Sequence, residues 1–217
     1  INIETPEGIK SGSTIQEIYY PPADSKNIHN PANQGIARGE AAYIDLGQRG
    51  VMVAIMQDPS NARERFKLLI RNVFPTVPTV YDLSRFQEML KHYNDIRNVK
   101  DEVQPWLYPT LVGFRDINDP KTIELIYQRK HGSVRDMQEV ETDRLEEFYG
   151  KGVKIQNMTL EMTDDPLEWK LDDKLNWIET MDEKDITHSL HEVVPRIPIT
   201  NGIAYYIFRQ GFEKHPK

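Results

Sequence analysis

The first part of the chain has apolar and polar positions at the spacing of β-strands. Residues 1–20 are patterned as strand, turn and strand, with turn residues at 5–8 and 10–13. Residues 40–46 and 51–56 are apolar at nearly every position and flank the turn sequence Gly-Gln-Arg-Gly at 47–50, which predicts a β-hairpin. Strands without alternation are typical of strands covered on both faces, so we expect this hairpin at the centre of a sheet.

Helical spacing dominates four other segments, each with a start or stop signal. Asp58-Pro59 begins a run that Pro75 ends, and Asp82 precedes a second stripe of Leu83, Phe86, Leu90 and Tyr93. Residues 142–149 form a short helix ended by Gly150. The fourth helix follows Asp165-Pro166, and its predicted inward stripe is Leu167, Leu171, Leu175 and Ile178.

The remaining apolar runs predict more strands. Residues 107–115 and 122–128 form a second hairpin around the turn 117–121, and 203–208 is a last β-like run. Residues 153–163 form a strand whose apolar phase switches, which indicates a bulge near Asn157. Together these elements predict a single α+β domain over residues 1–217, with a mainly antiparallel sheet built from hairpins and packed on one face by three to four helices. We expect a long loop at 21–39 and an exposed, charged insertion at 129–142.

Composition narrows the class of protein. The 217 residues are 38% hydrophobic and 28% charged, as in ordinary globular domains. The net charge is −7, and residues 136–192 carry 17 acidic and 6 basic side chains, so a broad nucleic-acid-binding face is not expected. A solvated acidic face explains this segment more simply than a site for cations or basic partners.

The chain has no cysteine, which excludes disulfides, thiolate metal sites and cysteine nucleophiles. No stretch approaches the ~20 apolar residues that a membrane-spanning helix needs. Ile1 is not an initiator methionine, and a strand-like stretch begins at once. We therefore expect a preceding segment, for which a cleaved signal peptide, a membrane anchor and plain trimming are all consistent explanations.

The most suggestive chemical pattern is His188-Ser189-Leu190-His191-Glu192. On a helix, His188 and His191 would share a face and could hold a divalent metal, with Glu192 as ligand or base. The order matches neither the zincin motif nor its inverse, and two surface histidines explain it more simply.

Acidic pairs offer weaker metal sites. Asp164-Asp165 and Asp172-Asp173 could supply oxygen ligands, but Asp165 is expected to cap the fourth helix, and Asp172 and Asp173 to lie on its outer face. The residues Asp116, Asn118 and Asp119 are typical of a turn.

No nucleophile elbow and no phosphate-binding glycine motif occurs, and no cofactor is predicted. The aromatic residues could line a ligand groove, although core or rim positions are more usual for them. They are Tyr19, Tyr20, Tyr205, Tyr206, Trp106, Trp169 and Trp177.

Several motifs resemble a family of uncharacterised proteobacterial proteins. They are Ile-Glu-Thr-Pro-Glu-Gly at 3–8, Ser-Gly-Ser at 11–13, Arg-Gly-Glu-Ala at 38–41, Asp-Leu-Gly at 45–47, Asp-Ile-Asn-Asp-Pro-Lys at 116–121, Thr-Asp-Asp-Pro at 163–166 and Leu-Asn-Trp-Ile at 175–178. The resemblance covers about half the chain and leaves out 58–105 and 129–142; the family usually has Pro where this chain has Asn176. It implies one N-terminal hydrophobic segment and a domain outside the cytoplasm, and it brings no assigned activity or catalytic residues.

These observations lead to one functional hypothesis and two alternatives. The first is a non-catalytic interaction or accessory subunit of a membrane-associated complex, on the periplasmic side of a bacterial inner membrane, with protein partners. The alternatives are a metal-dependent hydrolase that uses His188, His191 and a carboxylate such as Glu192 or Asp185, and a small-molecule-binding module built on the aromatic groove.

Overall fold

A computed structural model describes most of the chain. The described residues are 1–19, 36–55, 69–70, 72–74, 83–130, 135–178 and 213–214. Strands dominate them, with 37% strand against 22% helix. Every strand pair is antiparallel.

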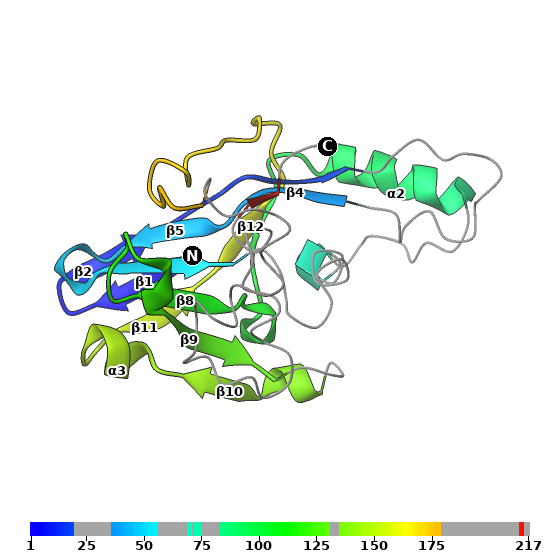
Figure 1. The fold of residues 1–217 in the computed structure, drawn as a ribbon. Coiled ribbons are helices and arrows are strands. Elements are labelled where there is room, and N and C mark those ends of the chain that lie inside the picture. The colour runs from blue at the N-terminus through cyan, green and yellow to red at the C-terminus, as the bar shows by residue number, and fades with distance from the viewer. Residues whose placement is uncertain are drawn as a thin grey trace.

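The centre of the fold is a five-stranded sheet in the order β10-β9-β8-β6-β5 (Figure 1). Its strands are β5 (Ala42–Asp45), β6 (Val51–Ala54), β8 (Leu111–Phe114), β9 (Ile123–Arg129) and β10 (Val140–Asp143). Both predicted hairpins are confirmed, since β5 pairs with β6 and β8 pairs with β9.

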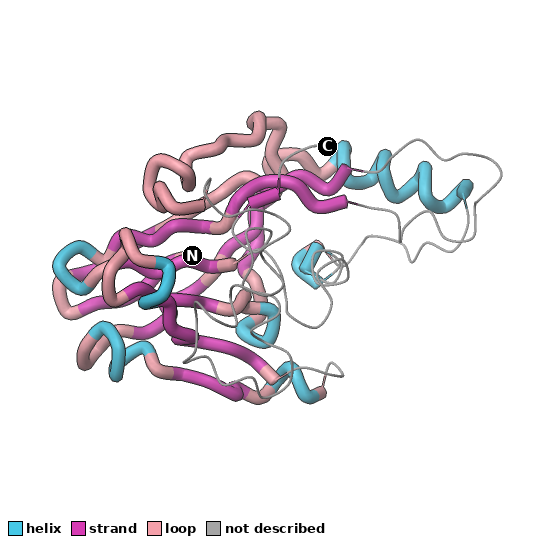
Figure 2. The backbone as a smooth tube through the Cα atoms, in the orientation of Figure 1, coloured by secondary structure: helices cyan, strands magenta, loops and turns pink. Residues whose placement is uncertain are grey.

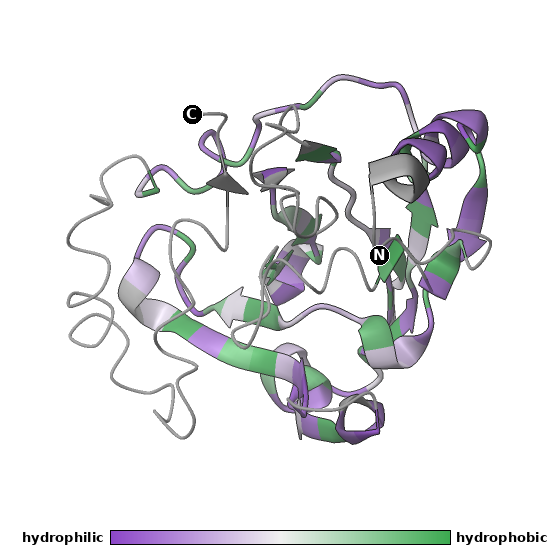
Figure 3. Cartoon of the chain, turned by 90° about the vertical axis from the view of Figure 1, so that its right-hand side faces the viewer, coloured by the Kyte–Doolittle hydropathy of each residue, from purple (hydrophilic) through white to green (hydrophobic). Residues whose placement is uncertain are grey.

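The β5–β6 hairpin is covered on both faces, as its sequence predicts. Ile44 and Met52 are buried in one core cluster, and Val53 and Ile55 are buried in the other. The bands of apolar and polar residues along the strands are visible in Figure 3. However, β5 ends the hydrogen-bonded order of the sheet instead of lying at its centre, because the preceding strand β4 (Ile36–Glu40) pairs elsewhere.

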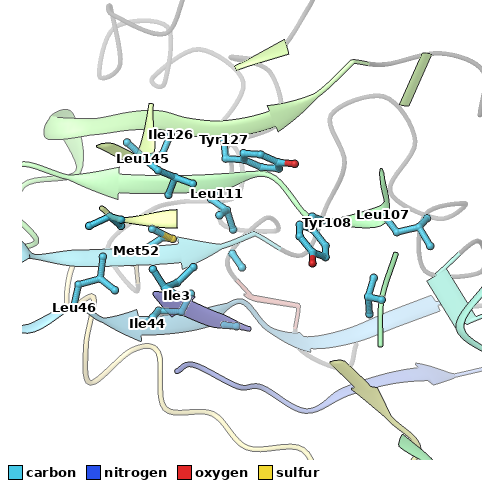
Figure 4. Packing of buried hydrophobic residues seen from close by; sticks show 14 of the residues in the cluster. Ile3, Ile44, Leu46, Met52, Leu107, Tyr108, Leu111, Ile126, Tyr127 and Leu145 are labelled. Atoms are coloured by element: carbon cyan, nitrogen blue, oxygen red, sulfur yellow. The ribbon is translucent and has the colours of Figure 1, made fainter. Parts of the chain in front are cut away.

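A three-stranded sheet covers one face of the central sheet; we call it the sheet cover. It has the order β11-β1-β2, with β1 (Asn2–Thr5), β2 (Gly8–Ser11) and β11 (Lys154–Asn157). Ile3 of β1 is fully buried against the central strands, and Figure 4 shows it beside Ile44 and Met52. The helix α3 (Leu145–Tyr149), which Gly150 ends as predicted, adds Leu145 to the same cluster.

Residues 163–178 cover the opposite face of the central sheet; we call this segment the strap. Leu171, Leu175 and Ile178 are fully buried against Val53 and Val112. The sequence predicts these side chains and Leu167 as an inward stripe; the burial of these three is confirmed, whereas Leu167 is only partly buried. The helix predicted over 166–178 is wrong, because the strap contains only isolated turns and bends. It is the loop that passes above β5 in Figure 1 and carries neither helix nor strand in Figure 2.

Two small sheets complete the described strands. One pairs β7 (Lys100–Glu102) with β12 (Thr159–Glu161), and the other has the order β13-β4-β3, with β3 (Gln16–Tyr19) and β13 (Glu213–Lys214). The predicted strand 153–163 is therefore two strands that join different sheets. The predicted bulge near Asn157 is confirmed, since the register between β1 and β11 shifts there.

Other predicted boundaries need correction. The loop expected at 21–39 ends earlier, because β4 begins at Ile36; residues 20–35 lie outside the described part. The insertion expected at 129–142 contains most of β10, which extends the central sheet although its side chains are largely exposed. The strand expected at 203–208 lies outside the described residues.

The prediction of three to four helices packed on one face is wrong for the described chain. Two α-helices are bounded there, α3 and α2 (Leu83–Asp95), and α2 confirms the prediction for that segment. Most of the helix predicted after Asp58 lies outside the described residues, although Leu69, Ile70, Asn72 and Val73 are helical. The fold is sheet-rich, and the central sheet has a sheet on one face and the strap on the other.

Candidate functional site

The predicted histidine site cannot be placed. His188, His191, Glu192 and Asp185 all lie outside the described residues. Within the described ranges, no group of three or more metal-binding side chains comes together. The metal site therefore stays a prediction.

The four aspartates of the strap have different surroundings. Asp164 forms an ion pair with Arg97 (Oδ1 to Nε, 3.1 Å), and Asp165 accepts a hydrogen bond from the hydroxyl of Thr163 (2.7 Å). Asp165 therefore caps no helix here. Asp173 is exposed, whereas Oδ1 of Asp172 is buried without a hydrogen-bond partner. The prediction that Asp172 lies on an outer helical face is wrong, because the strap is not a helix.

The turn at residues 116–120 has the local geometry that its composition predicts. Asp116 Oδ1 accepts a hydrogen bond from the backbone N–H of Asn118 (2.9 Å), and Thr122 Oγ1 donates to the carbonyl oxygen of Asp119 (2.8 Å). Aspartate and asparagine favour turns because they bond nearby backbone groups. These side chains are thus engaged in closing the β8–β9 hairpin.

The aromatic residues do not share one groove in the described structure. Trp177 is buried against Phe114, with ring centroids 5.7 Å apart, and its Nε1–H donates to the carbonyl oxygen of Ile117 (2.8 Å). Trp106 packs against the other core cluster, on the opposite face of the central sheet. The side chains of Tyr19, Tyr20, Tyr205 and Tyr206 lie outside the described part.

A charged clasp joins the sheet cover to the turn between β5 and β6. The Arg49 guanidinium donates to both carboxylate oxygens of Glu7 at 2.7 Å and to the carbonyl oxygen of Tyr149 at 2.6 Å. The hydrogen bonds from Arg49 lower the pKa of Glu7 from 4.5 to about 2. The Tyr149 hydroxyl donates to the carbonyl oxygen of Val51 (2.7 Å), and burial raises the pKa of Tyr149.

A second charged network surrounds α3. Glu124 accepts hydrogen bonds from Arg115 (2.8 Å) and Arg144 (3.0 Å), and Arg144 also bonds Glu147 (2.6 Å). Burial would raise the pKa of Glu124, but the two arginines outweigh it and lower the pKa. Arg115 stacks 3.8 Å from the ring centroid of Phe148. Both networks connect elements of the fold, so they are structural ion pairs.

The outward side of the sheet cover carries two cross-strand rows of side chains; we call it the outer sheet face. In one row, Asn2 Nδ2 donates to Asn157 Oδ1 and Ser11 Oγ donates to Asn2 Oδ1, both at 2.7 Å. In the other row Lys154 pairs with Glu4 (3.3 Å), and Ile9 lies opposite Glu4 on β2.

Ile9 is the most exposed large hydrophobic residue of the described chain, at 56%. This surface was not predicted from the sequence. The available signal was the alternation in residues 1–5, where Ile3 and Thr5 point inward and Asn2 and Glu4 point outward.

The comparisons with known proteins add no relative. No protein-family model, no curated protein and no solved structure matches the chain. The family resemblance of the sequence motifs thus stays a prediction. Among the described helices, none has the length and apolar character needed to cross a bilayer.

Proposed function

We propose that this chain is a non-catalytic interaction or accessory subunit of a membrane-associated complex on the periplasmic side of a bacterial inner membrane. The outer sheet face is the surface through which it contacts its protein partner. The periplasmic location rests on the family resemblance of its motifs.

The proposed contact surface rests on one observation, which is that the side chains of the outer sheet face are ordered. Its side chains are held in place by hydrogen bonds and an ion pair between three adjacent strands, so little side-chain entropy remains to be lost on binding. An exposed isoleucine at its edge supplies apolar area for an interface core. A regular sheet that packs its other side against the core supports this arrangement.

Two properties of the described residues favour a binding role over catalysis. The carboxylates with lowered pKa values, Glu7, Glu124 and Glu147, are each bonded to an arginine that joins elements of the fold. The tyrosine with the largest rise in pKa, Tyr149, is engaged with a backbone carbonyl. These perturbed groups therefore have structural explanations.

The test is purification of the tagged protein from native membranes in mild detergent, with mass spectrometry of the co-purifying chains. We expect a partner at fixed stoichiometry. Ile9→Arg should reduce its recovery at least tenfold, because the substitution places a charge in the interface core. The matched control is Val140→Arg on β10, since Val140 is also an exposed hydrophobic residue (43%) but lies outside the outer sheet face.

Three outcomes would contradict the proposal. An equal loss of partner recovery with Ile9→Arg and Val140→Arg would show that the outer sheet face is not the contact surface. Recovery of a monomer from membranes would contradict the subunit role. A native protein found in the cytoplasm would contradict the periplasmic location.

A further inference from the structure

The strap has the sequence of a helix but another conformation. Asp165 and Pro166 are a helix start, and Leu167, Leu171, Leu175 and Ile178 repeat at helical spacing. In the structure the strap has one hydrogen bond of the α-helical kind, from the N–H of Leu175 to the carbonyl oxygen of Leu171 (2.7 Å). A single turn of the α-helical kind therefore forms near the C-terminal end of the strap, and it does not extend through the segment.

The carboxylate of Glu40 lies where the helix would begin. Glu40 is the last residue of β4 and is only 7% exposed. Its Oε2 accepts the backbone N–H groups of Lys170 and Leu171, both at 2.8 Å. A carboxylate that accepts two backbone donors in a buried place makes charge-assisted hydrogen bonds, which are stronger than those to a neutral carbonyl.

These two donors would make the second and third hydrogen bonds of a helix that begins after Asp165. In a helix with Asp165 as N-cap, the N–H of Lys170 would bond the carbonyl oxygen of Pro166, and that of Leu171 would bond Leu167. With Glu40 as acceptor, two of the first three helical hydrogen bonds are lost. Helix formation is cooperative and its first turn is the costly step, so this competition acts where the helix is weakest.

We propose that Glu40 is a conformational selector, which holds residues 166–178 in the strap conformation and prevents the helix that their sequence favours. A helix would present Leu167, Leu171, Leu175 and Ile178, and the strap already buries the last three of these side chains together with Trp177. The segment can thus change its backbone conformation on one apolar face of the sheet. Removal of the Glu40 carboxylate shifts it to the helix.

The test is NMR of Glu40→Gln in the full chain, with backbone Cα chemical shifts read over residues 166–178. We expect values without helical character in the unsubstituted protein and helix-typical values in the variant, with a gain in ellipticity at 222 nm. The matched control is Glu17→Gln on the neighbouring strand β3, whose exposed carboxylate pairs with Arg38. This control should leave the strap shifts unchanged.

Two further variants keep the proposal falsifiable. Glu40→Asp keeps the charge but withdraws the carboxylate by one methylene, so it should give the same change even where Glu40→Gln does not fold. Adding the exposed substitution Asp173→Gly to either variant should reverse the gain, because glycine disfavours a helix interior. Unchanged strap shifts in folded Glu40→Gln or Glu40→Asp would overturn the proposal and leave Glu40 as an anchor only.

Discussion

The sheet cover and the strap lie on opposite faces of the central sheet, and they bury similar side chains with different backbone conformations. The sheet cover is an ordered ladder in which each strand satisfies the backbone groups of its neighbour. The strap has no ladder to the sheet among the described residues, and hydrogen bonds of the Glu40, Trp177 and Arg97 side chains connect it to the rest of the fold. Nevertheless Leu171, Leu175 and Ile178 are as fully buried as Ile3.

This difference teaches that burial and backbone conformation are separate properties. Fully burying a Leu or Ile side chain contributes roughly 1.5–3 kcal/mol whatever backbone presents it. Regular secondary structure is one way to satisfy the backbone polar groups that burial removes from water, and a side-chain carboxylate is another. The strap is therefore part of the core and not a loose lid.

The largest expected effect compares a core residue of each cover. Leu175→Ala in the strap and Ile3→Ala in the sheet cover should each lower the free energy of unfolding by about 2–5 kcal/mol, because each removes a fully buried side chain and leaves a cavity. Urea denaturation measures both losses of unfolding free energy when each variant has the same m-value as the unsubstituted protein. A cost below about 1 kcal/mol for Leu175→Ala alone would show that the strap is a loose cover.

A close approach between the central sheet and α3 gives the second prediction. A Cβ at Gly113 would lie 2.4 Å from the Tyr149 hydroxyl and 2.9 Å from Phe148, so Gly113→Ala must displace the hydroxyl from the carbonyl oxygen of Val51. We expect a loss of about 1–3 kcal/mol by the same measurement. Tyr149→Phe makes room for the methyl group, so the double variant should cost less than the sum of the two. Strict additivity would contradict this contact.

The sequence predicts the sheet cover better than the strap for a physical reason. Turns with glycine and runs of apolar residues are local signals, and they place β1 and both central hairpins, although they assign Lys10 and Ser11 of β2 to a turn. The strap depends on Glu40, which lies 130 residues away from Lys170 in the chain, and no local pattern contains that competition. Helical spacing therefore predicted the burial of Leu171, Leu175 and Ile178, but it did not predict the backbone conformation of the strap.

The same reasoning explains the outcome for the candidate site. The turn around Asp116 depends on neighbouring residues, and its composition predicts it. The outer sheet face requires the pairing of β1 with β11, from opposite parts of the chain, and Asn2 and Asn157 meet only in the folded protein. The histidine pair His188 and His191 stays a prediction because it lies outside the described residues.

A smaller effect is expected at the far end of the strap. Trp177→Phe keeps an aromatic ring against Phe114 but removes the hydrogen bond from Nε1 to the carbonyl oxygen of Ile117. We expect a loss of about 1 kcal/mol, which thermal unfolding would show as a fall in Tm. An unchanged Tm would mean that apolar contacts alone hold this end of the strap.

The smallest expected effect is the acid sensitivity of the clasp on the sheet cover. Because Arg49 lowers the pKa of Glu7 from 4.5 to about 2, the ionised carboxylate stabilises the folded state above pH 4.5. That stabilisation is lost as the pH falls from 4.5 to about 2. When Tm is measured against pH, the Tm of Glu7→Gln should therefore fall less steeply below pH 4.5 than the Tm of the unsubstituted protein.

The Glu7→Gln comparison isolates one carboxylate. Glu124 and Glu147 also have lowered pKa values and contribute to the acid limb of both proteins, so they cancel in the difference between the two curves. The difference should shrink in high salt, because Glu7 is exposed and its attraction to Arg49 is screened. A difference that is independent of both pH and salt would mean that the clasp acts through the contact of Arg49 with Tyr149 and not through the charge of Glu7.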